Sequence, residues 1–394
     1  MGSLRGKGLG PVLLTVLLDL LGFGLVIPLL SFYAEDYGAT PLQVTLLMAC
    51  YSLAQFVCAP MWGALSDRVG RRPVMLVSIG GTAVFLACFA AANTLWMLFV
   101  FRTLHGMCAA NIGTAQAYVA DVTAPEDRAR GMGLIGASFG VGMSVGPFIG
   151  GELSVFGLSA PIWAAAGLSA INFIWALFGL HESRPTGEKN RSSRSLNPRV
   201  WLAALAHPTI GLAIGLTFVQ TFAFAMMEST FALVAEHEWD MLAQDVGRLF
   251  GVIGIVGIVI QGGLIGRLVR TVGEQRLIGL GYLLNAVGLA WLAFTEPGWG
   301  IWGGCTLVAI GISVVNPSLA SLISRSALAE DQGKALGANQ SLSALARATA
   351  PAAGGVLFSA LFPGAAMAAG AVLMLVALGL SIPAVARVKQ ALPS

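Results

Sequence analysis

Long apolar stretches recur along the whole chain, and each is long enough to cross the hydrocarbon core of a lipid bilayer as a helix. We count twelve, at residues 9–33, 42–64, 74–92, 95–120, 131–153, 160–180, 208–235, 249–266, 276–295, 298–323, 335–361 and 363–386. The stretches are continuously apolar rather than alternating, which favours helices over the strands of a barrel. Only 10% of the residues are charged, whereas soluble domains have about 25%. The sequence therefore predicts an all-α membrane protein with twelve transmembrane helices.

The two halves of the chain repeat each other at an offset of 204 residues. The matching positions are Asp127 and Asp331, Arg130 and Lys334, Gly133 and Gly337, Pro147 and Pro351, Gly150 and Gly354, and Gly151 and Gly355. Several matches at one offset indicate duplication of a six-span unit. We predict an N-terminal six-helix bundle at 1–180, a linker at 181–200 rich in Arg, Ser and Pro, and a C-terminal six-helix bundle at 201–394.

The basic residues predict how the chain is oriented in the membrane. If the N-terminus is cytoplasmic, 19 of the 22 Lys and Arg residues fall in cytoplasmic loops and tails. Arg102 and Arg347 lie within spans, and only Arg248 falls near an outer loop. This distribution follows the positive-inside rule and predicts an inner (plasma) membrane protein with both termini in the cytoplasm. The net charge of +3 then reflects topology, and no nucleic-acid partner is expected.

Several other classes of protein lack support in the sequence. The first apolar stretch carries Asp19 and no small-residue cleavage site, so we expect a retained span rather than a signal peptide. The five cysteines lie in apolar spans without metal-ligand spacing, so no metal is expected. No Gly-Lys-Ser/Thr phosphate-binding loop is present, which argues against direct use of ATP. We predict a protein that is not an enzyme and binds no cofactor.

Four charged side chains lie inside four different apolar spans. They are Asp19, Arg102, Glu228 and Arg347. A charge in hydrocarbon is costly, so such residues face a bundle interior, pair with each other or exchange protons. Asp19 lies roughly 15 Å into its span, near the membrane middle, and is the leading candidate for a proton or cation site. The alternative is a permanently charged acid that pairs with Arg102 for structure.

Two groups of residues accompany these charges. His105 follows Arg102 by three residues, on nearly the same helix face, and is either a proton relay or a hydrogen-bonded interior histidine. Gln220, Phe224 and Phe231 surround Glu228 at helical spacing. This face either lines a cavity for lipophilic or cationic compounds or packs as an ordinary core. Arg347 is expected to neutralise Glu228.

A glycine- and arginine-rich segment follows the second span, and we call residues 63–72 the latch segment. Its notable residues are Gly63, Asp67, Arg68, Gly70, Arg71 and Arg72. We expect Asp67 to accept hydrogen bonds at a neighbouring helix N-terminus, and Arg71 or Arg72 to pair with Asp121. The alternative is that the arginines only determine topology. The corresponding segment 262–270 has no acid where Asp67 would fall, so the N-terminal half is expected to dominate the latch.

The fifth span carries glycines on one helix face. The set comprises Gly142, Gly146, Pro147, Gly150 and Gly151. Glycines four residues apart let another helix approach at backbone distance, and the proline removes one helical hydrogen bond. The pattern predicts a contact surface between helices and raises the hypothesis of a mobile pivot.

These motifs resemble those of the major facilitator superfamily. The latch segment is similar to the signature between spans two and three, and Arg102-Thr-Leu-His-Gly106 resembles the span-four arginine motif. Residues 142–151 are similar to the antiporter motif, and residues 18–28 resemble the first span of twelve-span drug/proton antiporters, particularly tetracycline exporters. As aligned, the third-span acid of tetracycline exporters falls at Val84, and span eight has no histidine. The resemblance thus implies related energetics with a different cargo.

We therefore expect a secondary active transporter of the major facilitator fold that exports a small amphipathic or drug-like molecule in exchange for protons by alternating access. Its partners would be the small-molecule substrate, protons and the lipid bilayer, and we expect a monomer. One alternative is a metabolite exporter or facilitator that protons do not drive. Another is a non-transporting membrane receptor or scaffold.

Overall fold

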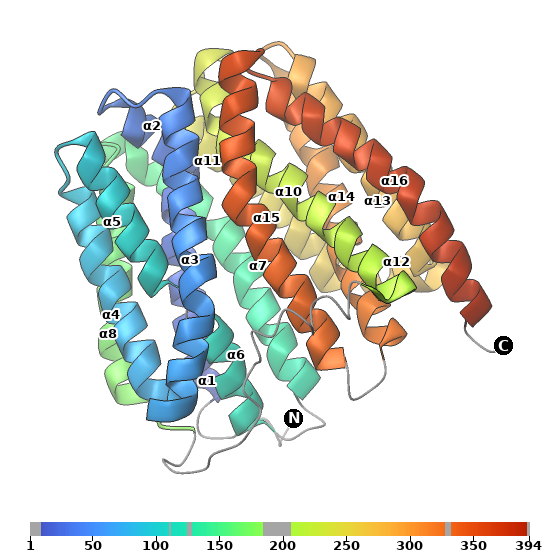
Figure 1. Cartoon of the computed structure of the whole chain (residues 1–394). Coiled ribbons are helices and arrows are strands. Elements are labelled where there is room, and N and C mark those ends of the chain that lie inside the picture. The colour runs from blue at the N-terminus through green and yellow to red at the C-terminus, as the bar shows by residue number, and fades with distance from the viewer. Residues whose placement is uncertain (1–8, 110–111, 124–127, 184–205, 328–331, 392–394) are drawn as a thin grey trace. The chain divides into compact units, whose positions relative to one another are not determined.

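The computed structural model describes residues 9–109, 112–123, 128–183, 206–327 and 332–391. Helices are the regular elements of this part of the chain, and it contains no strand (Figure 1). Most of the predicted linker lies outside the described residues, as do Asp127 and Asp331 of the repeat. The prediction of an all-α protein is confirmed.

The first half of the chain contains the helices of the first six predicted spans. They are α1 (Leu9–Val26), η1 (Ile27–Leu29), α2 (Leu30–Glu35), α3 (Pro41–Val69), α4 (Arg71–Ala90), α5 (Leu95–Cys108), α6 (Ile112–Val122), α7 (Arg128–Leu153), η3 (Ser154–Phe156) and α8 (Ala160–Gly179).

The second half contains the helices of the other six. They are α10 (Pro208–His237), α11 (Ala243–Val259), η4 (Ile260–Leu264), α12 (Ile265–Val272), α13 (Glu274–Phe294), α14 (Trp299–Ser326), α15 (Gln332–Ala360) and α16 (Ala365–Ala391). Among the described residues, ten helical stretches are long and apolar enough to cross a membrane, and the segment Ala365–Ser381 is a shorter apolar helix. The eleventh predicted span corresponds to α15, a 29-residue helix with a more polar sequence.

Three predicted spans are interrupted helices. The first contains a 3-10 turn with Pro28 at its start, where the missing proline N–H weakens the helical hydrogen bonding. The fourth is divided between α5 and α6, and α5 ends at Cys108. The eighth contains a π-helical turn over Ile260–Leu264, an irregularity common at functional sites. The apolar pattern alone does not distinguish these spans from continuous helices.

The chain divides into two compact units, neither of which is continuous in sequence. Unit 1 contains residues 1–40, 50–195 and 242–251, and unit 2 contains residues 41–49, 196–241 and 252–394. The first turns of α3 thus belong to unit 2, and the first turns of α11 belong to unit 1. This division differs from the predicted bundles only at these two exchanged segments and near the linker.

Each unit packs its helices around its own apolar core. In unit 1, α1 packs against α7 and α8, and α4 packs against α8 and α5. Val12, Ile79 and Tyr118 are among the buried side chains of this core. In unit 2, α13 packs against α14 and α16, and α10 packs against α15 and α16. Burial of these apolar faces positions the polar side chains that each unit carries inside it.

Candidate functional site

Asp19 lies in the middle of α1 and is half-buried in unit 1. Helical spacing places it on the same face as Phe23, one turn later, and opposite the face that meets α7. The Phe23 ring stacks on Tyr51 of α3, with ring centroids 5.4 Å apart. Asp19 therefore lies on the side of α1 that carries Phe23, away from the contact with α7.

Arg102 of α5 is buried, with only 2% of its surface exposed, and it forms a cluster with Tyr51 and His105. Its Cζ is 4.4 Å from the centroid of the Tyr51 ring, which is a cation–π geometry. His105, also buried, lies with its Nδ1 3.4 Å from the Arg102 Nη1, and its ring centroid is 5.1 Å from that of Tyr51. Tyr51 thus links the two residues predicted from the sequence.

The buried guanidinium of Arg102 is not fully hydrogen-bonded. Its Nε has no hydrogen-bond partner among the described residues. A buried donor without an acceptor costs free energy, so this position favours a water molecule or a polar ligand group. The cluster therefore combines a fixed positive charge, a histidine and an unsatisfied donor inside one helix bundle.

The glycine face of α7 lies directly against α1. A Cβ atom added at Gly24 would lie 2.6 Å from the carbonyl oxygen of Gly142 and 3.1 Å from the Cα of Gly146. A Cβ on Gly150 would collide with the Leu25 backbone. The close helix contact expected from the glycine spacing is present, and Pro147 lies within the same helix. A pivoting motion stays a prediction.

The last glycine of the motif makes a second close contact within unit 1. A Cβ on Gly151 would lie 2.9 Å from the Cα of Gly247 in the first turns of α11. In unit 2, a Cβ on Gly355 would collide with Thr45 in the first turns of α3. Gly151 and Gly355 are partners in the internal repeat, so the two exchanged segments are held by equivalent glycines.

A polar cluster adjoins the contact between Gly151 and Gly247. Arg248 donates from Nε to Glu152 at 2.8 Å, and Gln244 donates from Nε2 to the other carboxylate oxygen, also at 2.8 Å. Arg248 is the one basic residue predicted to lie near an outer loop. Its charge is balanced by Glu152, which no motif in the sequence indicates.

In the latch segment, Arg71 is the central residue. Its Nη2 lies 2.7 Å from Asp67 and its Nε lies 3.3 Å from Asp121, so the structure contains the expected pairing with Asp121. The Arg71 side chain is only 9% exposed. Arg72 instead donates from Nη2 to the carbonyl oxygen of Leu177 at 2.7 Å. Gly63 is partly exposed and Arg68 is exposed.

The N-terminus of α4 is capped by a residue that sequence analysis missed. The Glu182 carboxylate accepts from the backbone N–H groups of Arg71 at 2.8 Å and Arg72 at 3.2 Å. A carboxylate here satisfies helix-terminal N–H groups and complements the helix dipole. Gly70 has φ +103°, and a Cβ there would collide with the Glu182 carboxylate. The required glycine before Arg71 is the sequence signal of this cap.

The second half contains a related pair with the charges exchanged. Glu274, the first residue of α13, lies 3.4 Å from Arg325 of α14 and accepts from the Ser321 hydroxyl at 2.6 Å. Arg325 occupies the repeat position of Asp121, and Glu274 follows the positive-φ Gly273 as Arg71 follows Gly70. The second half thus has its own ion pair, although no acid occupies the position of Asp67. Because Arg325 is 62% exposed, this pair is weaker than that of Arg71.

In unit 2, Glu228 lies on α10 and interacts electrostatically with Arg347 of α15. Both side chains are half-buried. The helices approach closely here, because a Cβ on Gly354 would lie 2.9 Å from the Met226 side chain. The expected proximity of the two charges is therefore present.

The other members of the α10 face differ in burial. Gln220 is 2% exposed, and its Oε1 has no hydrogen-bond partner among the described residues. Phe224 is half-buried. Phe231 is fully buried and packs edge-on against Trp239, with centroids 5.6 Å apart. Phe231 and Gln220 thus lie in the packed interior, whereas Phe224 and Glu228 are partly exposed. That this face lines a cavity stays a prediction.

The described residues contain no group of three or more His, Cys, Asp or Glu side chains that could hold a metal ion. The intramembrane charges have aromatic and amide neighbours.

Comparison with known proteins gives a consistent picture. A family model described as Major Facilitator Superfamily matches residues 12–351. The tetracycline resistance protein, class C, of Escherichia coli is 34% identical over 374 residues, covering 93% of this chain and 94% of the relative. Multidrug resistance protein 2 of Bacillus subtilis (strain 168) is 27% identical over 376 residues, covering 94% of this chain and 93% of the relative. The crystal structure of the human organic anion transporter MFSD10 (TETRAN) is similar with a TM-score of 0.72 and 26% identity, covering 95% of this chain and 99% of that chain.

Proposed function

Because the chain belongs to the Major Facilitator Superfamily, a family of membrane transporters, we propose that it exports a small amphipathic or drug-like molecule in exchange for protons. The exchange occurs by alternating access between two six-helix bundles, residues 1–180 and 201–394, joined by the linker at 181–200. The protein acts as a monomer in the inner membrane, with both termini in the cytoplasm. The proton gradient supplies the energy, and no cofactor is required.

The observation that carries the proposal is the position of Asp19. It is a half-buried acid in the middle of a membrane-spanning helix, on a face away from the glycine contact with α7. Intramembrane acids are rare and mark ion and proton pathways. Asp19 binds and releases the proton, while Arg102 and His105 maintain the charge balance of the cluster.

The motif residues support the conformational part of the proposal. Gly142, Gly146 and Gly150 allow α7 to lie at backbone distance from α1, so a small rotation of α7 changes few side-chain contacts. Pro147 weakens the helix at the same place. Arg71 and Asp121 stabilise one end of unit 1, and their separation favours the other conformational state.

The α10 face supports the substrate class. Phe224 supplies an apolar ring, Gln220 an unsatisfied carbonyl oxygen and Glu228 a carboxyl group, a combination suited to amphipathic or cationic compounds. The names of the relatives, tetracycline and multidrug resistance proteins, agree with this class. Val84 and the absence of histidine from span eight favour a cargo other than tetracycline.

Reconstitution of the purified protein in liposomes with an imposed pH gradient tests the proposal. Fluorescent and radiolabelled drug-like compounds, tetracycline included, are followed with and without the gradient. The wild-type protein is expected to accumulate a compound only with the gradient. Asp19→Asn is expected to abolish gradient-driven accumulation while retaining gradient-independent exchange of the same compound.

The matched control is Asp36→Asn, which changes an exposed acid at the end of α2 and is expected to transport like the wild type. Transport that ignores the gradient would identify a facilitator. A protein that moves no compound under any condition would be a receptor or scaffold. Full activity of Asp19→Asn would remove the carboxyl group from the mechanism.

A further inference from the structure

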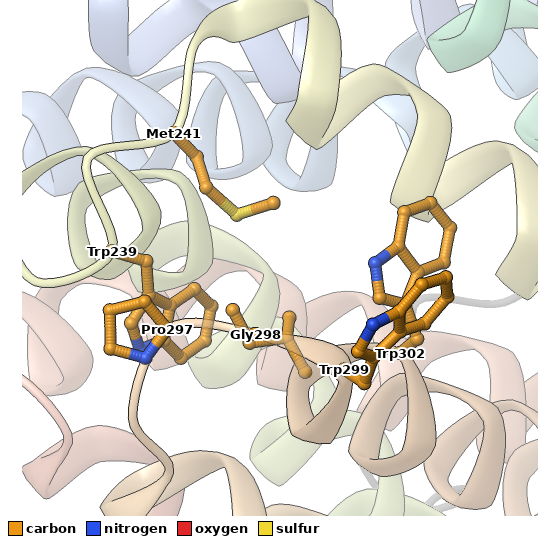
Figure 2. Close-up of a pocket in the computed structure, with 7 residues that line it drawn as sticks. Trp239, Met241, Pro297, Gly298, Trp299 and Trp302 are labelled. Carbon is orange, nitrogen blue, oxygen red and sulfur yellow. The ribbon is translucent and has the colours of Figure 1, made fainter.

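One end of unit 2 contains a pocket formed where α10 ends and α14 begins. Its volume is about 270 Å³, and it is lined by Trp239, Met241, Pro297, Gly298, Trp299, Ile301 and Trp302 (Figure 2). Three of the nine tryptophans of the chain thus surround one small space. The pocket is separate from the polar face of α10, although Phe231 connects the two through its contact with Trp239.

One wall of the pocket is fixed by the fold. Trp239 is 5% exposed, packs edge-on against Phe231 and donates from Nε1 to the carbonyl oxygen of Thr295 at 3.2 Å. The backbone turns sharply at Asp240 with φ 49° and at Gly298 with φ 141°, next to lining residues on both sides. These constraints hold the pocket in a defined shape.

The opposite wall is open to a ligand. Trp299 and Trp302 are three residues apart on α14 and therefore share a helix face, and Figure 2 draws both indoles on one side of the pocket. Trp299 is 90% exposed at the first residue of a membrane-spanning helix, a position where tryptophan lies at the membrane–water interface. In Figure 2 the flexible thioether of Met241 extends from its loop toward the space between the two walls.

The charges around the pocket are acidic. Glu238, Asp240 and Glu296 are exposed and adjoin the lining residues in sequence, and residues 236–245 and 295–302 contain no Lys or Arg. Indole faces attract cations, most strongly when the cation is partly desolvated. Neighbouring carboxylates add a negative potential, and methionine adapts to ligands of varied shape.

From this combination we propose that the pocket binds a lipophilic organic cation, with its charge near the indole faces and the acidic rim. The inference rests on the proposed function, because it names the class of compound that the protein exports. It also gives that compound a second binding site, apart from the one at Glu228. Binding itself needs no proton gradient. A quaternary ammonium lipid headgroup carries the same charge chemistry, and the test distinguishes it from a free cation.

The test is equilibrium binding of tetraphenylphosphonium to the purified full-length protein in a detergent without cationic groups. Binding is measured in the wild type and in Glu228→Gln. The second protein lacks the acid of the α10 face, so that binding at that face is not mistaken for binding in the pocket. Trp299→Ala removes an exposed indole, and Trp302→Ala removes its neighbour on the same face. Trp96→Ala, a 65% exposed tryptophan of unit 1, is the matched control.

We expect Trp299→Ala and Trp302→Ala each to weaken tetraphenylphosphonium binding about 3- to 30-fold. Trp96→Ala should bind like the wild type, and the neutral analogue triphenylphosphine oxide should bind far more weakly. Circular dichroism and thermal unfolding confirm that each variant is folded. Asp19→Asn should bind tetraphenylphosphonium like the wild type. Loss of proton coupling therefore leaves cation binding unchanged, whereas loss of an indole from the pocket weakens it.

Three outcomes would overturn the inference. The first is unchanged affinity for tetraphenylphosphonium in both tryptophan variants. The second is equal affinity of the pocket for the neutral analogue. The third is displacement of the bound cation by a phosphocholine lipid whose concentration is lower than that of the cation. The last result would assign the pocket to a lipid headgroup. Failure of gradient-driven transport in the wild type, with cation binding intact, would contradict only the proposed function.

Discussion

Gly151 of α7 and Gly247 of α11 meet backbone to backbone: a Cβ atom on Gly247 would lie 2.6 Å from the Cα of Gly151. The same Cβ would lie 2.6 Å from the carbonyl oxygen of Pro147. No side chain separates the two helices at this point, and one residue further along each helix Glu152 and Arg248 form an ion pair. The distance between Gly151 and Gly247 therefore shows directly whether these helices are in contact.

The Gly247→Ala substitution is expected to force α7 and the first turns of α11 apart. Overpacking of a close contact costs about 1–3 kcal/mol, so the population with the helices joined should fall about 5- to 150-fold. Cross-linking between cysteines introduced at exposed positions of the two helices measures this population. The control is Gly140→Ala on α7, where an added Cβ has nothing within 4 Å. Equal cross-linking in both variants would contradict the prediction.

Arg71→Ala is expected to destabilise the protein by about 2 kcal/mol, because it leaves Asp67 and Asp121 without their shared cation. Thermal unfolding in detergent measures the loss. Arg68→Ala removes an exposed arginine from the same segment and should change the stability by less than about 0.5 kcal/mol. Similar destabilisation by both variants would show that the ion pairs of Arg71 contribute no more to stability than an exposed arginine does.

Glu182→Gln is expected to weaken the cap of α4, since a neutral amide complements the helix dipole less well than a carboxylate. The expected loss is about 1 kcal/mol in the free energy of unfolding. Hydrogen exchange of the Arg71 and Arg72 amides should accelerate while exchange in α13 stays unchanged. Faster exchange throughout the protein would indicate general destabilisation instead.

Tyr51→Leu is expected to impair transport at least tenfold, because it removes the ring that lies over the Arg102 guanidinium. Tyr51→Phe keeps the ring and should retain most of the activity. Initial rates in proteoliposomes with matched amounts of protein measure the difference. A phenylalanine variant as inactive as the leucine variant would show that the hydroxyl, rather than the ring, is required.

Glu228→Gln and Arg347→Gln should each reduce transport, since each leaves a half-buried charge without its electrostatic partner. The double variant removes both charges and should be more stable than either single variant by about 1 kcal/mol or more. Thermal unfolding of the four proteins forms a double-mutant cycle. Asp36→Asn, which changes an exposed acid at the end of α2, is the control. Additive effects in the cycle would disprove the pairing.

The sequence predicted the helices well because an apolar stretch that spans a bilayer must satisfy its backbone hydrogen bonds internally. It also predicted the contact of Gly146 with a neighbouring helix. Small residues that recur every four positions lie on one helix face and let another helix approach at backbone distance. The π-helical turn at 260–264 was not predicted, although Gln261, Gly262 and Gly263 make it less apolar than the turns before it.

Three residues of the candidate sites could not be predicted from the sequence, and the physical reason is the same for each. Tyr51, Glu182 and Glu152 act through partners on other helices, and only tertiary packing brings these partners together. Tyr51 resembles any aromatic residue of an apolar span until Arg102 is placed over its ring. Charges within spans are recognisable from the sequence alone, whereas the groups that surround them are not.

The exchange of the first turns of α3 and α11 means that neither unit is encoded by one uninterrupted piece of the gene. Cleavage anywhere in the linker would give two fragments, and each would carry a short segment that completes the fold of the other. Such fragments should reach their final structure only when produced together.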